Sequence, residues 1–505
     1  MKHEIRTPTK ILVKNSFLNL MGMVIPIFIG LFAIPVTIKG LGKDGFGILS
    51  IAWVSIGYLV LLDFGLSRST TKYIAESLHH GNQFQINSYF NISILSALVI
   101  GTIGGLVFYL LTPELVNKWL NIPVDYQIQT LESLRLVAFS LPFLLISVIS
   151  KGSLGAAQRF DLVNFVHIPT SILYFLIPAL SYFYNLNIFQ VIAGIVISRI
   201  IAMAAYFILS VKVLHIQFRI SGPIIEHISK ILSYGGWVTI TGVISPLLVY
   251  IDRFFIGSVL TMSALTYYSA PMEALTRLRI FPNSIMLTMF PEFSKKSIYY
   301  TDNHLRILFG RAFKIILIIV AVGGLFLFAT ASDLLYLWLG EEYVENSLFI
   351  FKVLSLGIIF NFMALLPFTF LQGIGRPDIP AKLHLIELPV YLICLIFLLR
   401  HLGLSGAAIA WSFRVVLDCA LLYFYAKKNV TNLLRLFMEN NLICLTIIFI
   451  TYVVFLILIS VLVNHLIIRL ALYTMILIAT GLVIWLAGLN EKERAALYSA
   501  VRLSR

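Results

Sequence analysis

Seven basic side chains lie within long apolar stretches of this chain, and their type is suited to binding an anion. They are Arg135, Arg199, Arg253, Arg277, Arg279, Lys352 and Arg414. Because an arginine fork matches two phosphate oxygens at once, this set predicts a site for a phosphate-bearing ligand. A charge near the middle of a bilayer costs about 2.5–3.5 kcal/mol on insertion scales, so within a membrane each cation also needs a partner or water.

Acidic side chains in the same stretches offer partners to some of these cations. The pairs spaced three or four residues apart are Glu132 with Arg135, Glu273 with Arg277, and Arg414 with Asp418. Side chains at these spacings meet on a helix, so each pair either closes as a structural ion pair or leaves the cation to a ligand. Arg253 follows Asp252 and Lys352 lies near a helix end, so both could instead extend toward the membrane surface. Arg199 differs, because no acidic residue lies within four positions of it.

Two carboxylates are candidates for ion coupling. Asp63 lies near the end of the second apolar stretch, and Glu273 lies near the middle of the eighth. A buried carboxylate can exchange a proton near neutral pH. The alternatives are a helix-end role for Asp63 and an ion pair with Arg277 for Glu273.

The sequence contains no motif for metal or cofactor chemistry. It has neither a zinc-binding HExxH motif nor a glycine-rich phosphate loop. The three cysteines, Cys394, Cys419 and Cys444, fall within apolar runs and lack metal-ligand spacing. We therefore expect no catalytic residue, no metal and no cofactor.

The composition indicates the environment that surrounds these residues. Of the 505 residues, 59% are hydrophobic and 12% are charged, and the mean hydropathy is +0.95. Soluble proteins carry about 25% charged residues. The deficit excludes a soluble enzyme, a disordered chain and a nucleic-acid-binding domain, so the net charge of +14 does not indicate a nucleic-acid partner. We expect a polytopic protein that lies in the lipid bilayer.

Fourteen apolar stretches are long enough to cross a bilayer as helices, which takes about 20 residues each. They run approximately over 11–38, 46–67, 86–111, 128–150, 161–184, 187–211, 231–257, 264–290, 306–330, 346–372, 379–400, 403–426, 440–463 and 466–488. Backbone groups in lipid must be satisfied internally, so the predicted fold is an all-α membrane helix bundle. Most Lys and Arg residues outside the stretches fall on one side of the membrane, which places both termini in the cytoplasm.

Internal similarity predicts a duplication. The segment "LGAAQRFDLVN" resembles "LQGIGRPDIP" and aligns Arg159 with Arg376, while Arg199 aligns with Arg414. We therefore expect two six-helix pseudo-repeats, each forming one lobe, followed by a helix pair. The predicted division is an N-terminal lobe over 1–215, a C-terminal lobe over 216–430, and helices 13 and 14 with the tail over 431–505.

Three motifs carry a resemblance to a known family. "LGKDGFGILS" at 41–50, "DFGLSRSTTKYIAE" at 63–76 and "GSLGAAQRFDLVN" at 152–164 resemble the bacterial polysaccharide-biosynthesis transporters. These are the O-antigen (Wzx-like) and capsule oligosaccharide flippases of the multidrug/oligosaccharidyl-lipid/polysaccharide (MOP) superfamily. The second-half counterpart of the turn Gly45–Gly47 reads Ala264-Leu265-Thr266, so the repeat has diverged there.

The resemblance implies a transporter and not an enzyme. Such flippases move a polyprenyl-pyrophosphate-linked oligosaccharide from the cytoplasmic to the outer leaflet of the bacterial inner membrane by alternating access, for assembly of O-antigen, capsule or exopolysaccharide. A polymerase and a chain-length regulator act in the same pathway. Helices 1, 2, 7 and 8 line the cavity in that family, which makes Arg277 and Arg253 the leading substrate contacts. Arg199, Arg414, Arg279 and Lys352 follow as further candidates.

Two other functions stay open. An ion-coupled multidrug or toxin exporter of the same fold would be expected to have an acidic cavity, which the cation-rich interior argues against. An integral-membrane polymerase or ligase would need a large outer loop. The longest outer loops, around 112–127 and 331–345, are short and carry no convincing acid–base pair.

Overall fold

The computed structural model describes residues 9–63, 65–218, 236–294, 302–428, 442–489 and 494. Every regular element in these ranges is a helix, so the all-α prediction is confirmed. Within the same ranges, ten helices are long and apolar enough to cross a membrane. The count of fourteen spans and the cytoplasmic placement of both termini stay predictions.

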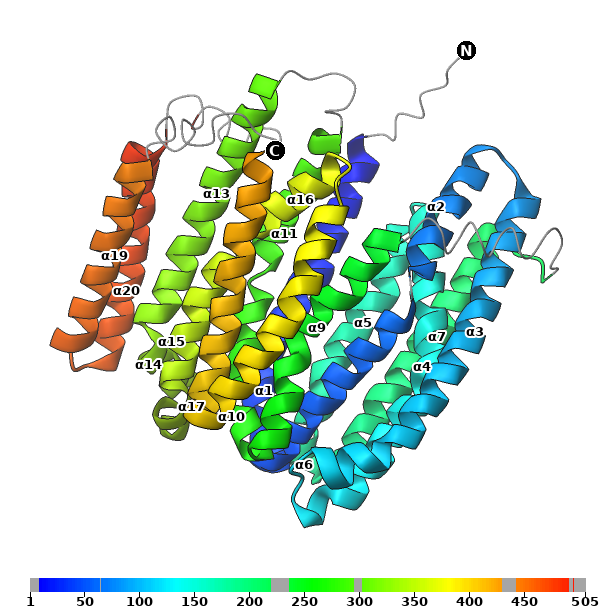
Figure 1. Cartoon of the computed structure of the whole chain (residues 1–505), viewed down its shortest axis with the longest axis horizontal. Helices are drawn as coiled ribbons and strands as arrows, with labels where there is room; N and C mark the ends of the chain where they lie inside the picture. Colours follow the sequence, from blue (N-terminus) through cyan, green and yellow to red (C-terminus); the bar gives the residue numbers. More distant parts are fainter. Residues whose placement is uncertain are drawn as a thin grey trace. The chain divides into compact units, whose positions relative to one another are not determined.

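The chain divides into two compact units, Met1–Ala270 and Pro271–Arg505. The helices that lie in the first unit are α1 (Thr9–Val60), α2 (Leu66–His79), α3 (Gln83–Glu114), α4 (Val124–Ala156), α5 (Phe160–Ala179), α6 (Ser181–Tyr184), α7 (Ile188–Leu214), α9 (Gly236–Val259) and the first part of α10 (Met262–Arg277). In this unit α4 packs against both α3 and α7, while α1 packs against α5 (Figure 1). The division into 1–215, 216–430 and 431–505 stays a prediction.

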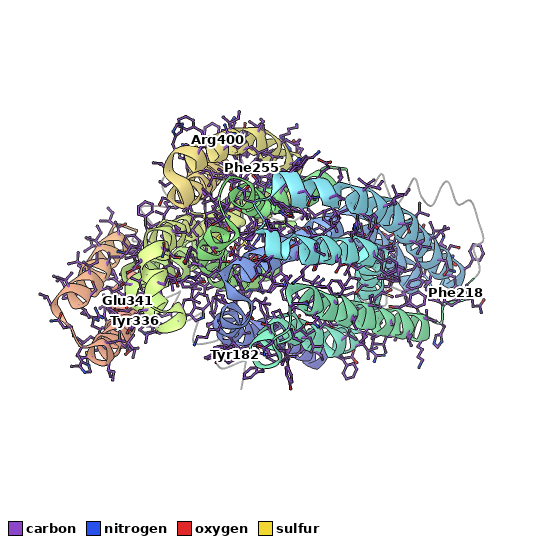
Figure 2. The ribbon with its side chains drawn as sticks, turned by 90° about the horizontal axis from the view of Figure 1, so that it is seen from below. Tyr182, Phe218, Phe255, Tyr336, Glu341 and Arg400 are labelled. Carbon is purple, nitrogen blue, oxygen red and sulfur yellow. The ribbon has the colours of Figure 1, made fainter. Side chains whose placement is uncertain are left out.

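The second unit contains the end of α10 and the helices that follow. These are α11 (Ile280–Ser294), α13 (Asp302–Ala329), α14 (Ala331–Leu339), α15 (Glu341–Met363), α16 (Leu365–Gly373), α17 (Asp378–Lys427), α19 (Leu442–Leu462) and α20 (Leu466–Val483). The packed partners of α15 include α13 and α17. At the connection between α14 and α15, Tyr336 and Glu341 are exposed and lie near one another (Figure 2).

Two helices are too long for a single crossing. α1 has 52 residues and α17 has 50, and a rise of about 1.5 Å per residue makes each more than twice the bilayer core of about 30 Å. Each bends at a glycine with positive φ, Gly42 at 72° and Gly403 at 58°. Glycine adopts this backbone conformation without a Cβ clash. The two bends separate the spans predicted at 11–38 and 46–67 and those at 379–400 and 403–426.

Lipid-facing surface is evident on α3. Many large apolar side chains are exposed along its middle, and they include Leu95, Leu98, Val99, Ile103, Leu106 and Leu110, whereas the exposed polar residues Gln83 and Glu114 lie at its two ends. A water-soluble helix would present charged residues on its outer face. The outer face of α3 is therefore the kind of surface expected of a helix that faces lipid.

The duplicated motif at 154–164 and 371–380 adopts the same structure in both units. Arg159 forms a two-pronged ion pair with Asp161 at 3.0 Å, and Arg376 forms the equivalent pair with Asp378 at 2.9 and 3.2 Å. The preceding residues, Gln158 and Gly375, both have positive φ. The local agreement supports the predicted duplication.

The diverged turn of the repeat packs against its counterpart within the first unit. The Oγ of Ser263 donates to Asp44 at 2.7 Å, and Thr266 donates to the carbonyl of Lys43 at 2.6 Å. A Cβ at Gly47 would collide with the backbone carbonyl of Met262. The turn 41–50, which follows the first predicted span, therefore packs closely against the start of α10.

The helix pair α19–α20 is attached to the second unit by a polar contact and an apolar one. Asp333 on α14 pairs with Arg469 on α20 at 2.8 Å and accepts a hydrogen bond from Tyr473 at 3.0 Å. Tyr452, Leu456 and Tyr473 pack with side chains of α13. In Figure 1, α19 and α20 lie side by side next to α13.

Candidate functional site

A break in the eighth predicted span carries two of the candidate arginines. α10 ends at Arg277 and α11 begins at Ile280, so the span 264–290 is not one continuous helix. Pro282 explains the break, because its ring would clash with the carbonyl four residues earlier, at Leu278. The turn is closed by hydrogen bonds from Leu278 to Leu275 and from Arg279 to Thr276, both at 3.2 Å.

Arg277 and Arg279 are the two candidate arginines at this break. Arg277 Nη2 bonds to Glu273 Oε2 at 2.8 Å, so the predicted helical ion pair is formed. The Arg277 side chain nevertheless stays 32% exposed, whereas that of Glu273 is 10% exposed. Arg279 is exposed at the same break. Both guanidinium groups are therefore at least partly exposed at the break.

Arg253 is enclosed by aromatic and acidic side chains in the first unit. It is 2% exposed, and its guanidinium lies 5.2 Å from the ring centre of Tyr250. Tyr58 on α1 contacts the rings of both Tyr250 and Phe254. Extension toward the membrane surface is therefore wrong for Arg253, and a ligand could reach it only after these aromatic side chains moved.

Asp252 anchors the same cluster. It is fully buried and accepts hydrogen bonds from the Tyr268 hydroxyl and from the Arg253 backbone N–H. Burying a carboxylate is costly unless donors surround it. The contact with Tyr268 joins α9 to α10 within the first unit.

Arg199 and Arg414, the pair aligned by the repeat, have equivalent surroundings. The Arg199 guanidinium lies 5.3 Å from the ring centre of Tyr174, and that of Arg414 lies 5.5 Å from the ring centre of Tyr391. Among the described residues, Nε of each arginine has no hydrogen-bond partner. A cation over an aromatic face is attracted by the ring quadrupole. Both arginines are therefore held by aromatic rings of the neighbouring helix, in α5 and in the first arm of α17.

The remaining cations also contact rings. Lys352 is half-buried, with its Nζ 5.7 Å from the ring centre of Phe328 on α13. Arg135 lies 4.8 Å from the ring centre of Tyr109. Within the described part of the chain, Glu132 forms no ion pair with Arg135, so that predicted pair is not made.

The two coupling candidates are both occupied with structural partners. The carboxylate oxygens of Asp63 accept from the backbone N–H of Ser67 at 3.1 and 3.2 Å. This contact caps the first turn of α2, which is the helix-end role considered above. Glu273 is bonded to Arg277. A coupling role for either residue stays a prediction.

A polar cluster on α17 was missed by sequence reasoning. His384 Nε2 lies 3.5 Å from Asp418 Oδ1, across the bend at Gly403, and Glu387 lies beside them. One nitrogen of His384 and one oxygen of each carboxylate all lie within 4.8 Å of one another. Asp418 is therefore directed to His384, and its predicted pair with Arg414 is absent from the described structure. The spacing of His384 and Glu387 placed them on one helix face, but only the fold brings Asp418 to that face.

Sequence comparison connects the chain to proteins of known family. The family model described as "Polysaccharide biosynthesis protein" matches residues 12–297. A putative O-antigen transporter of Shigella flexneri is 30% identical over 419 residues, which cover 81% of this chain and 96% of that protein. The uncharacterized membrane protein EpsK of Bacillus subtilis is 21% identical over 430 residues, which cover 81% of each chain.

Solved structures share the fold. The lipid II flippase MurJ in an inward closed conformation has a TM-score of 0.72 at 14% identity, covering 94% of this chain and 99% of that one. An inward-facing multidrug resistance MATE family transporter of the MOP superfamily has a TM-score of 0.69 at 14% identity, covering 82% and 98%. At these identities the likeness concerns the fold alone.

Proposed function

Because the chain belongs to the polysaccharide biosynthesis protein family, we propose that it flips a polyprenyl-pyrophosphate-linked oligosaccharide from the cytoplasmic to the outer leaflet of a bacterial inner membrane. The observation that carries the proposal is the putative O-antigen transporter, which is matched over 96% of its length. The transported unit would serve assembly of a surface polysaccharide. Substrate movement by alternating access would make the protein a transporter without catalytic residues.

The fold is compatible with this function but does not select it. Its structural neighbours include one protein named a lipid II flippase and another named a multidrug transporter. The polar groups accessible at the α10–α11 break supply the chemical preference, because Arg277 and Arg279 suit a pyrophosphate better than an organic cation. We infer that the break receives the anionic head of the lipid carrier.

Deletion of the protein in its own bacterium, followed by tracking of the lipid-linked glycan, tests the proposed function. We expect glycan units to accumulate on the cytoplasmic face and the surface polysaccharide to disappear, with recovery on complementation by the full chain. Normal surface glycan together with new drug sensitivity would contradict the proposal and favour the exporter. If a polymerase and a chain-length regulator share the pathway, both should lose their supply of substrate in the deletion strain.

A further inference from the structure

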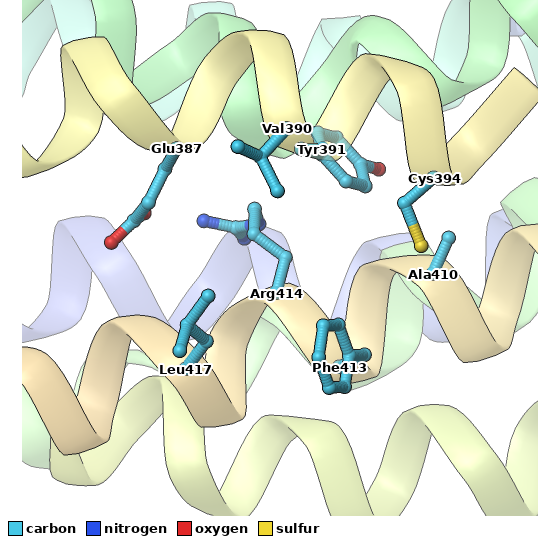
Figure 3. Close-up of a pocket in the computed structure, with 8 residues that line it drawn as sticks. All are labelled: Glu387, Val390, Tyr391, Cys394, Ala410, Phe413, Arg414 and Leu417. Atoms are coloured by element: carbon cyan, nitrogen blue, oxygen red, sulfur yellow. The ribbon is translucent and has the colours of Figure 1, made fainter.

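A buried polar cluster lies between the two arms of α17, apart from the arginines at the α10–α11 break. We call it the α17 cluster, and its members are His384, Glu387, Arg414 and Asp418. None of the four residues is more than 6% exposed. Figure 3 shows Glu387 from one arm and Arg414 from the other pointing into the space between them.

The two carboxylates of the α17 cluster face each other. Neither oxygen of Glu387 accepts a hydrogen bond from a described donor group. The charged groups beside the Glu387 carboxylate are Asp418, which lies against it, and Arg414, which lines the same pocket. Two carboxylates in such proximity cannot both stay ionised without a compensating positive charge.

The charge balance of the α17 cluster is one positive charge short. Two ionised carboxylates and one guanidinium sum to −1 when the His384 ring is neutral. A net charge in a dry interior costs several kcal/mol. One added proton would bring the cluster to neutrality, and a divalent ion would overshoot it.

The other groups around the α17 cluster leave this balance unchanged. On α17 itself, Tyr391 and Trp411 contact Arg414 through their rings, and Cys394 lines the same pocket. Cys419 follows Asp418 along the helix. These groups are neutral in their ordinary protonation states.

Neighbouring helices contribute one aromatic ring and two lysines. Phe368 on α16 stacks on the His384 ring at 5.9 Å. Lys352 on α15 is directed to Phe328 of α13. Lys314 on α13 is buried as well and has an interaction of its own, and among the described residues it forms no ion pair with Glu387 or Asp418. The acidic residues of α15, Glu341, Glu342 and Glu345, lie in its first turns, at the end where the chain leaves α14.

The α17 cluster lies deep in the hydrocarbon region. Glu387 is nine residues from the start of α17, and Asp418 is nine residues from its end. At about 1.5 Å per residue, both lie about 14 Å along their arms, near the middle of a core about 30 Å thick. Placing ionisable groups at this depth costs free energy. Such a cluster is therefore a candidate functional site.

We propose that the α17 cluster is a proton-binding site, in which Glu387 and Asp418 share one exchangeable proton beside His384. The proton enters as hydronium and leaves to water, so no other reactant is needed. Asp63 and Glu273 are less suited to this role, because each is already bonded to a donor. Coupling of this proton to glycan movement rests on the proposed function, whereas proton binding itself does not.

Infrared difference spectroscopy on the purified full chain in lipid, titrated between about pH 5 and pH 10, tests the proposal. We expect a protonated carboxylic acid band that titrates in the wild type. Glu387→Gln and Asp418→Asn should each lose it, and Glu341→Gln, which changes an exposed carboxylate at the start of α15, should keep it. A band that persists in both cluster variants would overturn the proposal.

Sodium provides the second arm of the same experiment. If the cluster carboxylates show no carboxylic acid band without Na⁺, and their carboxylate bands shift when Na⁺ is added at constant pH, a metal ion and not a proton occupies the α17 cluster, and the proposal is wrong. The spectra need no substrate, so a wrong assignment of the cargo would leave them unchanged. Conversely, the surface glycan of the deletion strain does not depend on which group gives the carboxylic acid band. Each proposal can therefore be contradicted while the other stands.

Discussion

At the scale of single residues, burial distinguishes Arg253 and Arg414 from Arg277. Arg253 and Arg414 are at most 5% exposed and lie over aromatic rings, whereas Arg277 is accessible and bonded to a carboxylate. A cation that is stacked and enclosed is closed to a ligand from outside, whereas one at a helix break can exchange partners. The residue scale therefore ranks Arg277 and Arg279 first for contact with an anionic cargo.

Substitution of Arg277 tests this ranking. A charge-assisted hydrogen bond contributes about 1.5–3 kcal/mol, so Arg277→Ala should lower glycan export about tenfold or more while the protein still inserts normally. Arg277→Lys should recover only part of the export, because lysine keeps the charge but loses the fork. Surface glycan measured at matched protein levels is the readout. Wild-type export by Arg277→Ala would remove this residue from the site.

At the scale of elements, the close contact between the turn 41–50 and the start of α10 is reinforced by a neighbouring loop. The backbone N–H of Asn121 donates to Gly257 at 2.8 Å, and its side chain donates to Ser258 and Leu260 at 2.8 Å. These bonds satisfy carbonyls at the C-terminal end of α9, which otherwise have no partner within the helix. The loop after α3 therefore holds the end of α9 in place.

Glycine at position 47 is required by the same contact. Gly47→Ala would place a Cβ against the Met262 carbonyl, and overpacking of this kind costs about 1–3 kcal/mol. Thermal unfolding in detergent should show a lowered Tm, whereas Gly57→Ala, at a glycine with open space beside it, should leave the Tm nearly unchanged. If the two variants had the same Tm, the turn would accommodate the added Cβ at Gly47 without loss of stability, and the prediction would be wrong.

The docking of α19 and α20 depends on the pair Asp333–Arg469. Breaking a buried ion pair leaves one charge uncompensated, so Arg469→Met should destabilise this contact by about 3 kcal/mol. Limited proteolysis should then release the helix pair more readily than in the wild type. The matched control is Arg159→Met, which breaks an exposed pair worth about 1 kcal/mol or less. If Arg469→Met were cleaved at the wild-type rate, the apolar contact with α13 would be sufficient by itself to dock α19 and α20.

At the scale of the whole molecule, the orientation of the chain in the membrane is predicted only from the distribution of its Lys and Arg residues. The excess of Lys and Arg predicts that both termini face the cytoplasm. A single cysteine placed after Arg505, in a variant whose three native cysteines are replaced by serine, should react with a membrane-permeant thiol reagent only. A cysteine at Glu341 should react with an impermeant one. The reverse pattern would invert the topology and with it the direction of transport.

The sequence by itself determined the class of the molecule and much of its local structure. Apolar runs require helices in lipid, and the duplicated Arg–Asp motif is local enough to form from neighbouring residues alone. The motifs at 41–50, 63–76 and 152–164 were also sufficient to identify the family, because each is a continuous segment that can be recognised without knowledge of the tertiary structure.

Only the tertiary structure decided which charges meet. Asp418 was four residues from Arg414, and local spacing favoured that pair, but the bend at Gly403 brings His384 and Glu387 to it from the other arm. Tyr174 and Tyr391 were likewise not evident as partners of Arg199 and Arg414. Helix periodicity gives the face on which a residue lies, whereas the partner depends on which other helix covers that face, and that is a property of the packed bundle.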